Sequence, residues 1–556
     1  MTPADEAPGG SLPRPSSNRK PLLILAAAVF FLHLIVTGGH LMSPDEELMY
    51  RTAEAIAFRG TTRITPLEAD FATGMLPPNF PPALAFATRV GREPGTFHAQ
   101  YGPLQPLLSV PFIHLAKALQ GAFAESFAAH VGPGMTMTYL QTLPDSERAA
   151  AIFRRGFLVM LFGPLVSAIS AVLLARLGRL LTGSRRAGLC AAALYSFATM
   201  AWPHARTYFT EPLAALLAFA ALDQLCRWYL QPLARGFGHA ALAGVFLGLA
   251  NLTRVDSPLF TAGMITAMAG LAAWRTISAD SWARRGERNA FFDVFVAGGI
   301  ATTCWVLLQL FNSARYGAVD LTAGYGDQTE GVKFSTPILI GLHGLLMSPG
   351  KGMFFFSPAL LLGIWGWAQA PHRMRWLAWL TLFAYVPFFI MMALWQNWAG
   401  GWCWGPRHVM QVHLPLMLGS VFLFQQALSL PRRVIVGAAL LVGALVQLYG
   451  SSQSPLEYYR EYFTTYRDGI YHQVNMEPLQ QQAIGHDFVF AFRNLDGSQS
   501  ADINPTMFPA PILDSIYVPQ HSQWASYHQM WQIGFCDFYF WNALTNRKLP
   551  DRWGQP

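Results

Sequence analysis

The chain has 556 residues, of which 53% are hydrophobic and only 12% are charged. Soluble domains usually carry about 25% charged residues, so this composition indicates a polytopic membrane protein. The formal net charge is +7, but no basic run is interleaved with aromatic residues, which argues against nucleic-acid binding. In a membrane protein such an excess usually lies in cytoplasmic loops.

The N-terminal residues 1–20 are polar, and we expect them to form a disordered cytoplasmic segment. The apolar run 21–42 follows a basic flank, as the core of a signal peptide would. It is about 20 residues long, enough to cross a bilayer, and no A-x-A cleavage site follows it. We interpret it as an uncleaved first membrane span.

Ten further apolar runs predict an all-α polytopic bundle of about eleven membrane helices. After 21–42 the predicted spans are 155–181, 187–202, 211–229, 238–252, 257–274, 291–311, 353–370, 377–396, 408–428 and 433–450. The apolar segment 102–123 contains three prolines, and we expect a juxtamembrane helix there, inside a long first outer loop at 43–154. Residues 451–556 are predicted to be an extramembrane segment, with strands at 487–495 and 514–518.

The distribution of basic residues predicts the orientation of this bundle. With the N-terminus in the cytoplasm, the short inner segments hold 17 lysines and arginines and the short outer loops hold 6. The polar motifs then all lie on the outer side: SPDEE (43–47), HAQYGP (98–103), WPHARTYFTEP (202–212), LTRVDSP (252–258), YGDQTEGVKF (325–334), SPGKG (348–352) and WQNWAGGWCWGPRH (395–408). Clustering on one side is typical of an active site at one membrane surface. A transporter would instead carry polar residues at mid-membrane.

These motifs, in this order, resemble a known family. An acidic pair directly after the first span, a long first outer loop and RTYFTEPLAALLAF (206–219) resemble the GT-C glycosyltransferases, in particular the protein O-mannosyltransferase and aminoarabinose-transferase branch. The segments 344–362 and 398–418 resemble stretches of its bacterial members. The likeness covers about residues 20–450. It implies a polyprenyl-phosphate sugar donor and inverting transfer, outside the cytoplasm, at a bacterial inner membrane.

The resemblance makes Asp45 the general base, with Glu46 as a second catalytic acid that holds the acceptor or shares a metal. The chemistry agrees, because glycosyl transfer needs a carboxylate beside the incoming hydroxyl. The alternative is a helix start, since Ser43 and Glu46 have the spacing of a capping box. Glu47 and Glu54 are expected to be solvated. Metal use stays open.

The leaving lipid phosphate would need cations at the outer interface, where arginine offers a bidentate fork. The candidates are Arg407, Lys351, Arg206, Arg254 and His408. The alternative for Lys351 and Arg407 is that they reach toward lipid headgroups.

Four further residues are candidates for binding the acceptor or the sugar: Glu211, His204, Tyr101 and Trp402. Glu211 has a structural alternative, in which Thr210 caps the helix and Glu211 meets its dipole. The tryptophans of 395–404 have one too, as an interfacial aromatic belt. Asp256 either lines the cleft or serves local structure.

The sequence therefore predicts a transferase whose acceptor is a lipid, a glycan or a protein. A transporter or flippase for a lipid-linked saccharide is the alternative, and a catalytically silent relative that binds such lipids is a third hypothesis. No cofactor is required by the motifs, although a divalent metal is compatible with them. A disulfide between Cys403 and Cys536 would need both to face an oxidising compartment.

Overall fold

The computed structural model describes most of the predicted membrane domain. The described residues are 19–64, 88–131, 143–231, 233–278, 290–317, 334, 336–395, 398–400, 403–453, 523 and 537–545. Residues 1–18, Trp402, Cys536 and both strands predicted near the C-terminus lie outside these ranges.

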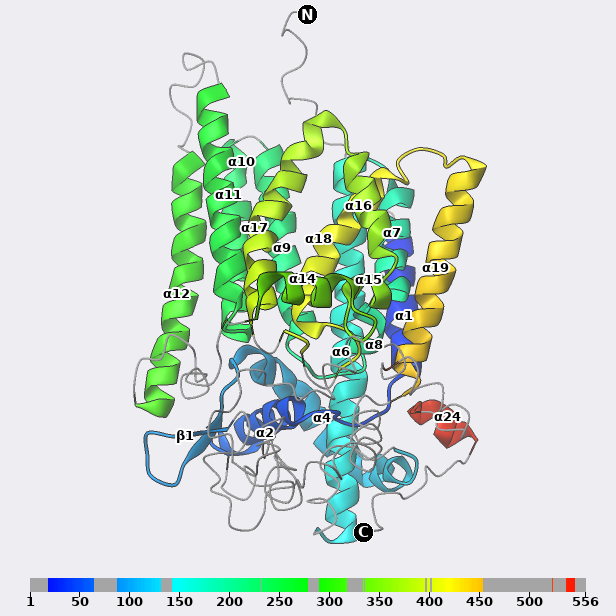
Figure 1. Cartoon of the computed structure of the whole chain (residues 1–556). Helices are drawn as coiled ribbons and strands as arrows, with labels where there is room; N and C mark the ends of the chain where they lie inside the picture. The colour runs from blue at the N-terminus through cyan, green and yellow to red at the C-terminus, as the bar shows by residue number, and fades with distance from the viewer. Residues whose placement is uncertain are drawn as a thin grey trace, which may run out of the picture.

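Long helices run side by side along one axis of the molecule (Figure 1). They are α1 (Lys20–Ile35), α6 (Asp145–Thr182), α7 (Arg185–Ala198), α9 (Glu211–Leu230), α10 (Leu233–Thr253), α11 (Ser257–Ser278), α12 (Ala290–Tyr316), α17 (Arg375–Leu394) and α19 (Leu430–Ser451). Smaller elements gather at the end of the bundle drawn lowest in Figure 1, which we call the lower end. They include α2 (Pro44–Arg59), α4 (Leu104–Ala128) and a two-stranded antiparallel hairpin of β1 (Thr88–Val90) and β2 (Phe97–Ala99).

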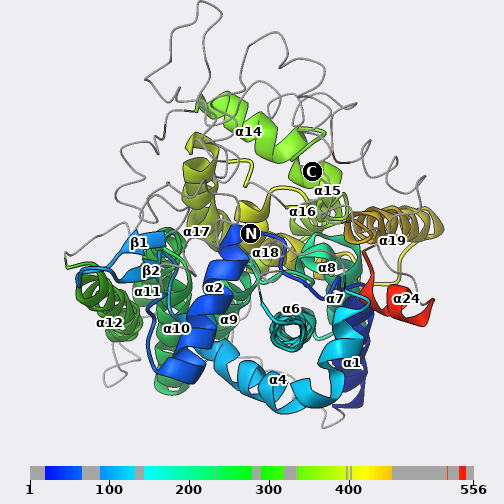
Figure 2. The same ribbon diagram turned by 90° about the horizontal axis from the view of Figure 1, so that it is seen from below.

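Among the described residues, eight helices are long and apolar enough to cross a membrane. Seven of them match predicted spans, and the eighth is α4, for which a juxtamembrane helix was predicted. Figures 1 and 2 show α4 lying across the lower end of the bundle rather than along its axis. Its length and composition therefore do not distinguish a span from a helix that lies on the surface of the bundle.

Two of the predicted spans are broken in the structure. The run 353–370 forms α15 (Met353–Phe356) and α16 (Leu360–Ala368), and Pro358, which cannot donate a helical hydrogen bond, lies between them. The run 408–428 forms η3 (Arg407–Val412), α18 (His413–Leu418) and η4 (Gly419–Phe422). A Cβ on Gly366 would lie 2.0 Å from the carbonyl oxygen of Gly419, so glycine is what lets these segments touch. Interruptions of this kind are tolerated in a membrane protein where the protein itself surrounds them.

Two further predictions were too long. The first span is α1, which ends at Ile35 rather than at residue 42, and α7 has 14 residues in place of the predicted 187–202. In both cases the chain leaves the helix before the apolar run ends. The extra residues form the loops that lead into α2 and into α8 (Ala201–His204).

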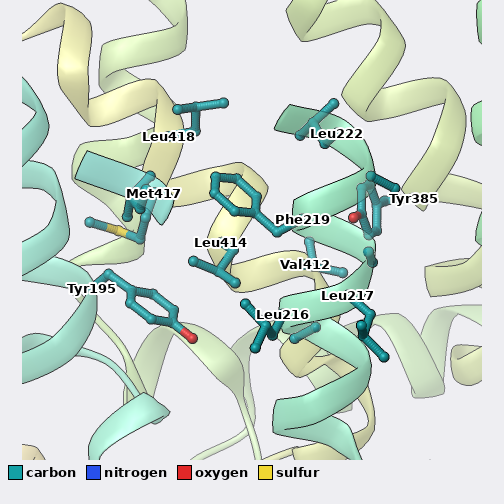
Figure 3. Close-up of a cluster of buried hydrophobic side chains, with 14 of the residues drawn as sticks. Tyr195, Leu216, Leu217, Phe219, Leu222, Tyr385, Val412, Leu414, Met417 and Leu418 are labelled. Carbon is teal, nitrogen blue, oxygen red and sulfur yellow. The ribbon is translucent and has the colours of Figure 1, made fainter. Parts of the chain in front are cut away.

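Helix α9 lies in the centre of the hydrophobic core. Figure 3 shows Phe219 and Leu222 of α9 beside Leu414 and Met417 of α18, with Tyr385 of α17 on the other flank. Phe219, Leu222 and Leu414 are completely buried. This packing fixes the position of the first residue of α9, Glu211, at the lower end.

Candidate active site

The start of α2 confirms the capping box. The hydroxyl of Ser43 accepts a hydrogen bond from the Glu46 amide (3.3 Å), and the Glu46 carboxylate accepts from the Ser43 amide (3.2 Å). The same carboxylate accepts from the amides of Met42 and Tyr208, the latter at 2.8 Å. Burial raises the pKa of Glu46 to about 7, although these amide donors favour its ionised form. Glu46 therefore ties α2 to the loop that precedes α9.

Asp45, one residue earlier, makes a different contact. Its side chain is nearly buried, and one carboxylate oxygen accepts from the guanidinium of Arg407 at 2.7 Å. The other oxygen has no hydrogen-bond partner among the described residues. Arg407 is itself buried and lies over the ring of Phe209, 4.1 Å from its centroid. The headgroup alternative for Arg407 is therefore wrong.

Glu211 is the second buried carboxylate of the site. It lies 2.7 Å from Arg254, 3.4 Å from His408 and 3.7 Å from Arg407. Thr210 occupies the N-cap position of α9 but makes no capping bond, because its hydroxyl accepts from Arg254 at 3.0 Å. The capping alternative is therefore wrong for Thr210.

Arg254 joins Glu211 to a third carboxylate, Asp256, at 2.7 Å. Five charged residues from four separate parts of the chain thus form one buried cluster, with His408 beside it. We call it the acid–arginine network: Asp45, Glu211, Arg254, Asp256 and Arg407. It holds one more carboxylate than guanidinium. Charges buried at the end of a membrane bundle are costly unless paired, and such groups commonly mark functional sites.

Two of the predicted residues support the turn that leads to Arg407. The ammonium of Lys351 donates to the carbonyl oxygens of Cys403 (2.7 Å) and Gly405 (3.2 Å), and the Nε2 of His204 donates to that of Trp404 (2.9 Å). Lys351 is buried, which lowers its pKa, so the headgroup alternative is wrong for it as well. Both side chains face main-chain oxygens rather than the network.

Three of the predicted residues remain to be located: Tyr101, Arg206 and Trp402. Tyr101 lines a water-sized cavity together with Gln100, Thr210, Arg254 and Asn312. Arg206 is buried and pairs with Asp537 of the C-terminal segment. Trp402 lies outside the described residues. In the part of the chain that is described, no three histidine, cysteine or acidic side chains are placed to hold a metal ion.

The prediction that Glu47 is solvated is wrong, because its side chain is fully buried. It accepts from Arg155 at 2.7 Å and from Arg51, and these two cations hold its pKa below the usual range against the effect of burial. Glu54 is also paired, with the Tyr50 hydroxyl (2.9 Å) and Arg154 (3.1 Å). An arginine at the start of a predicted span was the available signal, because such a charge needs a partner.

The aromatic-belt alternative is wrong for two of the four tryptophans. Trp398 and Trp404 are each only 2% exposed. A Cβ on Gly344 would lie 2.2 Å from the Trp398 ring, and one on Gly450 would lie 2.3 Å from the Trp404 ring. Trp395 is half-buried, with its ring centroid 4.8 Å from that of His408. Trp398 and Trp404 therefore pack against the bundle.

Comparison with solved structures identifies proteins of similar architecture. The AglB oligosaccharyltransferase of Archaeoglobus fulgidus, in complex with an inhibitory peptide and a dolichol-phosphate, is 12% identical with a TM-score of 0.43, covering 85% of this chain and 61% of its own. ArnT of Cupriavidus metallidurans, bound to undecaprenyl phosphate, is 14% identical with a TM-score of 0.43, covering 95% of this chain and 77% of its own. This similarity in fold is consistent with the predicted resemblance.

The similarity has limits in sequence and in length. No protein-family model matches the sequence, and no curated protein matches it. The apo form of the A. fulgidus oligosaccharyltransferase is 13% identical with a TM-score of 0.39, and the chain covers 60% of it. The chain thus spans about three-fifths of the length of the archaeal enzyme.

Proposed function

We propose that the protein is a membrane glycosyltransferase that moves a sugar from a polyprenyl-phosphate donor to an acceptor hydroxyl at the lower end of the bundle. The acid–arginine network carries this proposal. It gathers carboxylates and guanidinium groups at one end of an apolar bundle, where a lipid-anchored donor would present its phosphate. The reaction needs both kinds of group within reach of one sugar carbon.

Asp45 is the general base of the proposed reaction. Its free carboxylate oxygen takes the proton of the acceptor hydroxyl, while the other stays bound to Arg407. The acceptor oxygen forms a bond to the anomeric carbon as the bond from that carbon to the phosphate oxygen breaks. The lipid phosphate leaves with the electron pair, and a single displacement inverts the anomeric centre.

Arg407 receives the charge of the leaving phosphate. Its guanidinium pairs with Asp45 and lies near Glu211, so the cation that holds the base in place would also receive the charge of the leaving phosphate. Arg254 holds Glu211 and Asp256 in place, and His408 lies at the edge of the same cluster. Glu46, Lys351 and His204 act as supports, because each is bonded to main-chain groups.

The location of the network favours an enzyme over a transporter. A transporter needs a site near mid-membrane that opens to both sides in turn. The network instead lies at the starts of α2, α9 and η3, at the lower end. With α1, α7, α15–α16 and η3–η4 counted as crossings beside the seven long axial helices, the described residues supply eleven proposed membrane segments. The basic-residue bias supports a lower end outside the cytoplasm. A bacterial inner membrane, with a lipid, a glycan or a protein as the acceptor, is part of this proposal.

The deciding experiment compares Asp45→Asn with Ser43→Ala, using purified protein and a panel of polyprenyl-phosphate sugars. Asp45→Asn keeps the shape but removes the base, so the turnover rate should fall on the order of a hundredfold or more while donor binding is preserved. Ser43→Ala removes the helix cap, costs about 1 kcal/mol of stability and should leave turnover largely unchanged. Equal turnover in Asp45→Asn and the parent would refute the assignment.

The proposed orientation has its own test. In a cysteine-free background, Glu93→Cys on the exposed hairpin should react with an impermeant thiol reagent in intact cells. Arg432→Cys, at the exposed start of α19, should react only after the cells are opened. The opposite pattern would place the network on the cytoplasmic side and contradict the proposed donor.

A further inference from the structure

A second buried charge cluster lies beside the network and contains a residue of the C-terminal segment. The Asp537 carboxylate accepts from the Nε2 of His40 (2.9 Å) and from the guanidinium of Arg206. The three side chains are 1%, 6% and 2% exposed. Removing three ionisable groups from water costs desolvation free energy. The groups must therefore compensate that cost by pairing with one another.

The two partners of Asp537 occupy equivalent places in the chain. His40 lies five residues before Asp45, in the loop between α1 and α2. Arg206 lies five residues before Glu211, in the loop between α8 and α9. Asp537 therefore bridges the two loops that precede the two central carboxylates of the network.

The main chain around Asp537 is pinned to the same region. The amide of Asp537 donates to the carbonyl oxygen of Ser452 (2.8 Å), and the amide of Tyr539 donates to that of Thr37 (3.0 Å). The Tyr539 ring stacks on Phe127 of α4 with centroids 4.4 Å apart. Several independent contacts thus bring this carboxylate to the cluster.

The loop between α1 and α2 leaves room for the cluster at Gly38. A Cβ at this position would lie 2.8 Å from a carboxylate oxygen of Asp537, 2.8 Å from the Nε2 of His40 and 2.9 Å from the Arg206 guanidinium. Any residue larger than glycine would push all three side chains. Gly38 therefore provides a second, independent position at which the cluster can be disturbed.

The loop that Arg206 anchors makes two contacts with the active site. The amide of Tyr208 donates to Glu46, which caps the helix that carries Asp45. The ring of Phe209 lies under Arg407. We propose that Asp537 is a positioning residue of the active site. It holds together the loop before Asp45 and the loop before Glu211, and so keeps these two carboxylates and Arg407 in their relative positions. This role rests on the proposed function.

The charges of the cluster give it a pH window. His40 faces Asp537 and Arg206, and the attraction of Asp537 raises the pKa of His40 above its usual range despite burial. The pKa of Asp537 is lowered by His40 and Arg206, again against burial. The protonated imidazole is lost as the pH rises through the raised pKa of His40, and the carboxylate is lost as the pH falls through the lowered pKa of Asp537. The fastening is strongest between these limits.

The test uses Asp537→Asn in the full chain, with Asp223→Asn as the matched control. Asp223 is also 1% exposed and also pairs with an arginine, Arg227 at 2.8 Å, but it lies near the opposite end of α9. In Asp537→Asn we expect the turnover rate to fall about 10- to 100-fold with little change in donor KM, because the reacting groups are misaligned rather than removed. The alkaline limb of the pH profile should move to lower pH, since His40 loses its anion. Asp223→Asn should leave the KM and the pH profile unchanged.

Hydrogen exchange supplies a readout that does not depend on activity. The amides of Met42 and Tyr208, both bonded to Glu46, should exchange on the order of tenfold faster in Asp537→Asn and in Gly38→Ala, but not in Asp223→Asn. If these amides exchange faster in Asp537→Asn while Asp45→Asn keeps full activity, the positioning role of Asp537 is supported and the transferase assignment fails. Unchanged exchange at both amides would overturn the positioning role. Higher turnover in Asp537→Asn would also overturn it, since the segment would then obstruct the site.

Discussion

The two ends of the bundle both contain buried charges, but they pair them in different ways. At the upper end, Asp223 pairs with Arg227 one helical turn away at 2.8 Å. Arg275 donates to the main-chain carbonyls of Trp228 and Gln231, at 3.2 and 2.7 Å, where α9 ends. At the lower end, Arg407 meets an acid 362 residues away, and Arg254 is shared between two acids.

This difference indicates that the pair at the upper end stabilises the structure, whereas the network at the lower end is a candidate functional site. A pair within one turn forms as soon as its helix forms, and it satisfies two groups that would otherwise be buried alone. The lower network needs distant segments to converge, and it leaves an oxygen of Asp45 without a partner among the described residues. Buried polar groups that are incompletely satisfied are a reason to look for function.

The largest expected effect comes from Arg407→Ala. This change leaves Asp45 without its cation and weakens the field at Glu211, so breaking the pair should cost about 3–5 kcal/mol of unfolding free energy. Donor affinity should fall roughly 10- to 150-fold, which corresponds to about 1.5–3 kcal/mol for a lost charge-assisted hydrogen bond. Lipid-donor binding and thermal unfolding in detergent measure both.

Arg407→Lys is the control for this prediction. It keeps the charge but loses the planar fork, so it should restore only part of the donor affinity. If Arg407→Ala bound the donor as the parent does, phosphate binding would have to be assigned to other cations, Arg254 first.

A smaller effect is expected at Arg254. One ammonium cannot reproduce the fork that joins Glu211 to Asp256, so Arg254→Lys should lower kcat/KM by roughly tenfold. Arg275→Lys is the matched change at the upper end, where the fork donates to carbonyl oxygens and lies over the ring of Trp228, and it should leave kcat/KM unchanged. Equal losses in the two variants would remove the distinction between the ends.

Glu46 gives a prediction about pH. Its pKa in the folded protein, about 7, is above its ordinary value of 4.5, so the folded state holds this proton more tightly than the unfolded state. The stabilisation is complete below pH 4.5 and is lost as the pH rises through 7, by at most about 1.4 kcal/mol per pH unit. Unfolding of the parent and of Glu46→Gln at pH 5, 6 and 7 isolates this contribution. A difference between the two proteins that does not change with pH would contradict it.

Elements defined by local pattern could be read from the sequence. The span predicted at 211–229 is α9, and the capping box of Ser43 and Glu46 is present as its spacing indicated. Both follow from interactions within a few residues, apolar length in one case and side chain to backbone in the other. Such signals carry over directly into structure.

Pairings across the chain could not be read in this way. The sequence predicted Asp45 as a general base and Arg407 as a phosphate-binding cation, each from its own motif. Neither motif indicated that the two side chains would form an ion pair. The sequence also predicted Arg206 as a ligand of the donor phosphate and did not indicate that it would pair with Asp537. Composition alone does not tell whether a tryptophan near a membrane surface belongs to an interfacial belt or is buried. Trp398 and Trp404 are buried because glycines on neighbouring helices leave room for their rings.

The smallest expected effect on activity is at Asp223, and it is the one that most sharpens the comparison. Asp223→Asn keeps the shape of a buried side chain but removes the charge that Arg227 pairs with, so it should cost about 1–3 kcal/mol of unfolding free energy. Because Asp223 lies near the end of α9 opposite to Glu211, the loss should not reach the network. Thermal unfolding should therefore shift, while kcat and KM for the donor stay at the parent values below the unfolding temperature. A loss of donor affinity comparable to that of Arg407→Ala would mean that α9 couples the two ends, and charge pairing at the upper end would then belong to the mechanism as well.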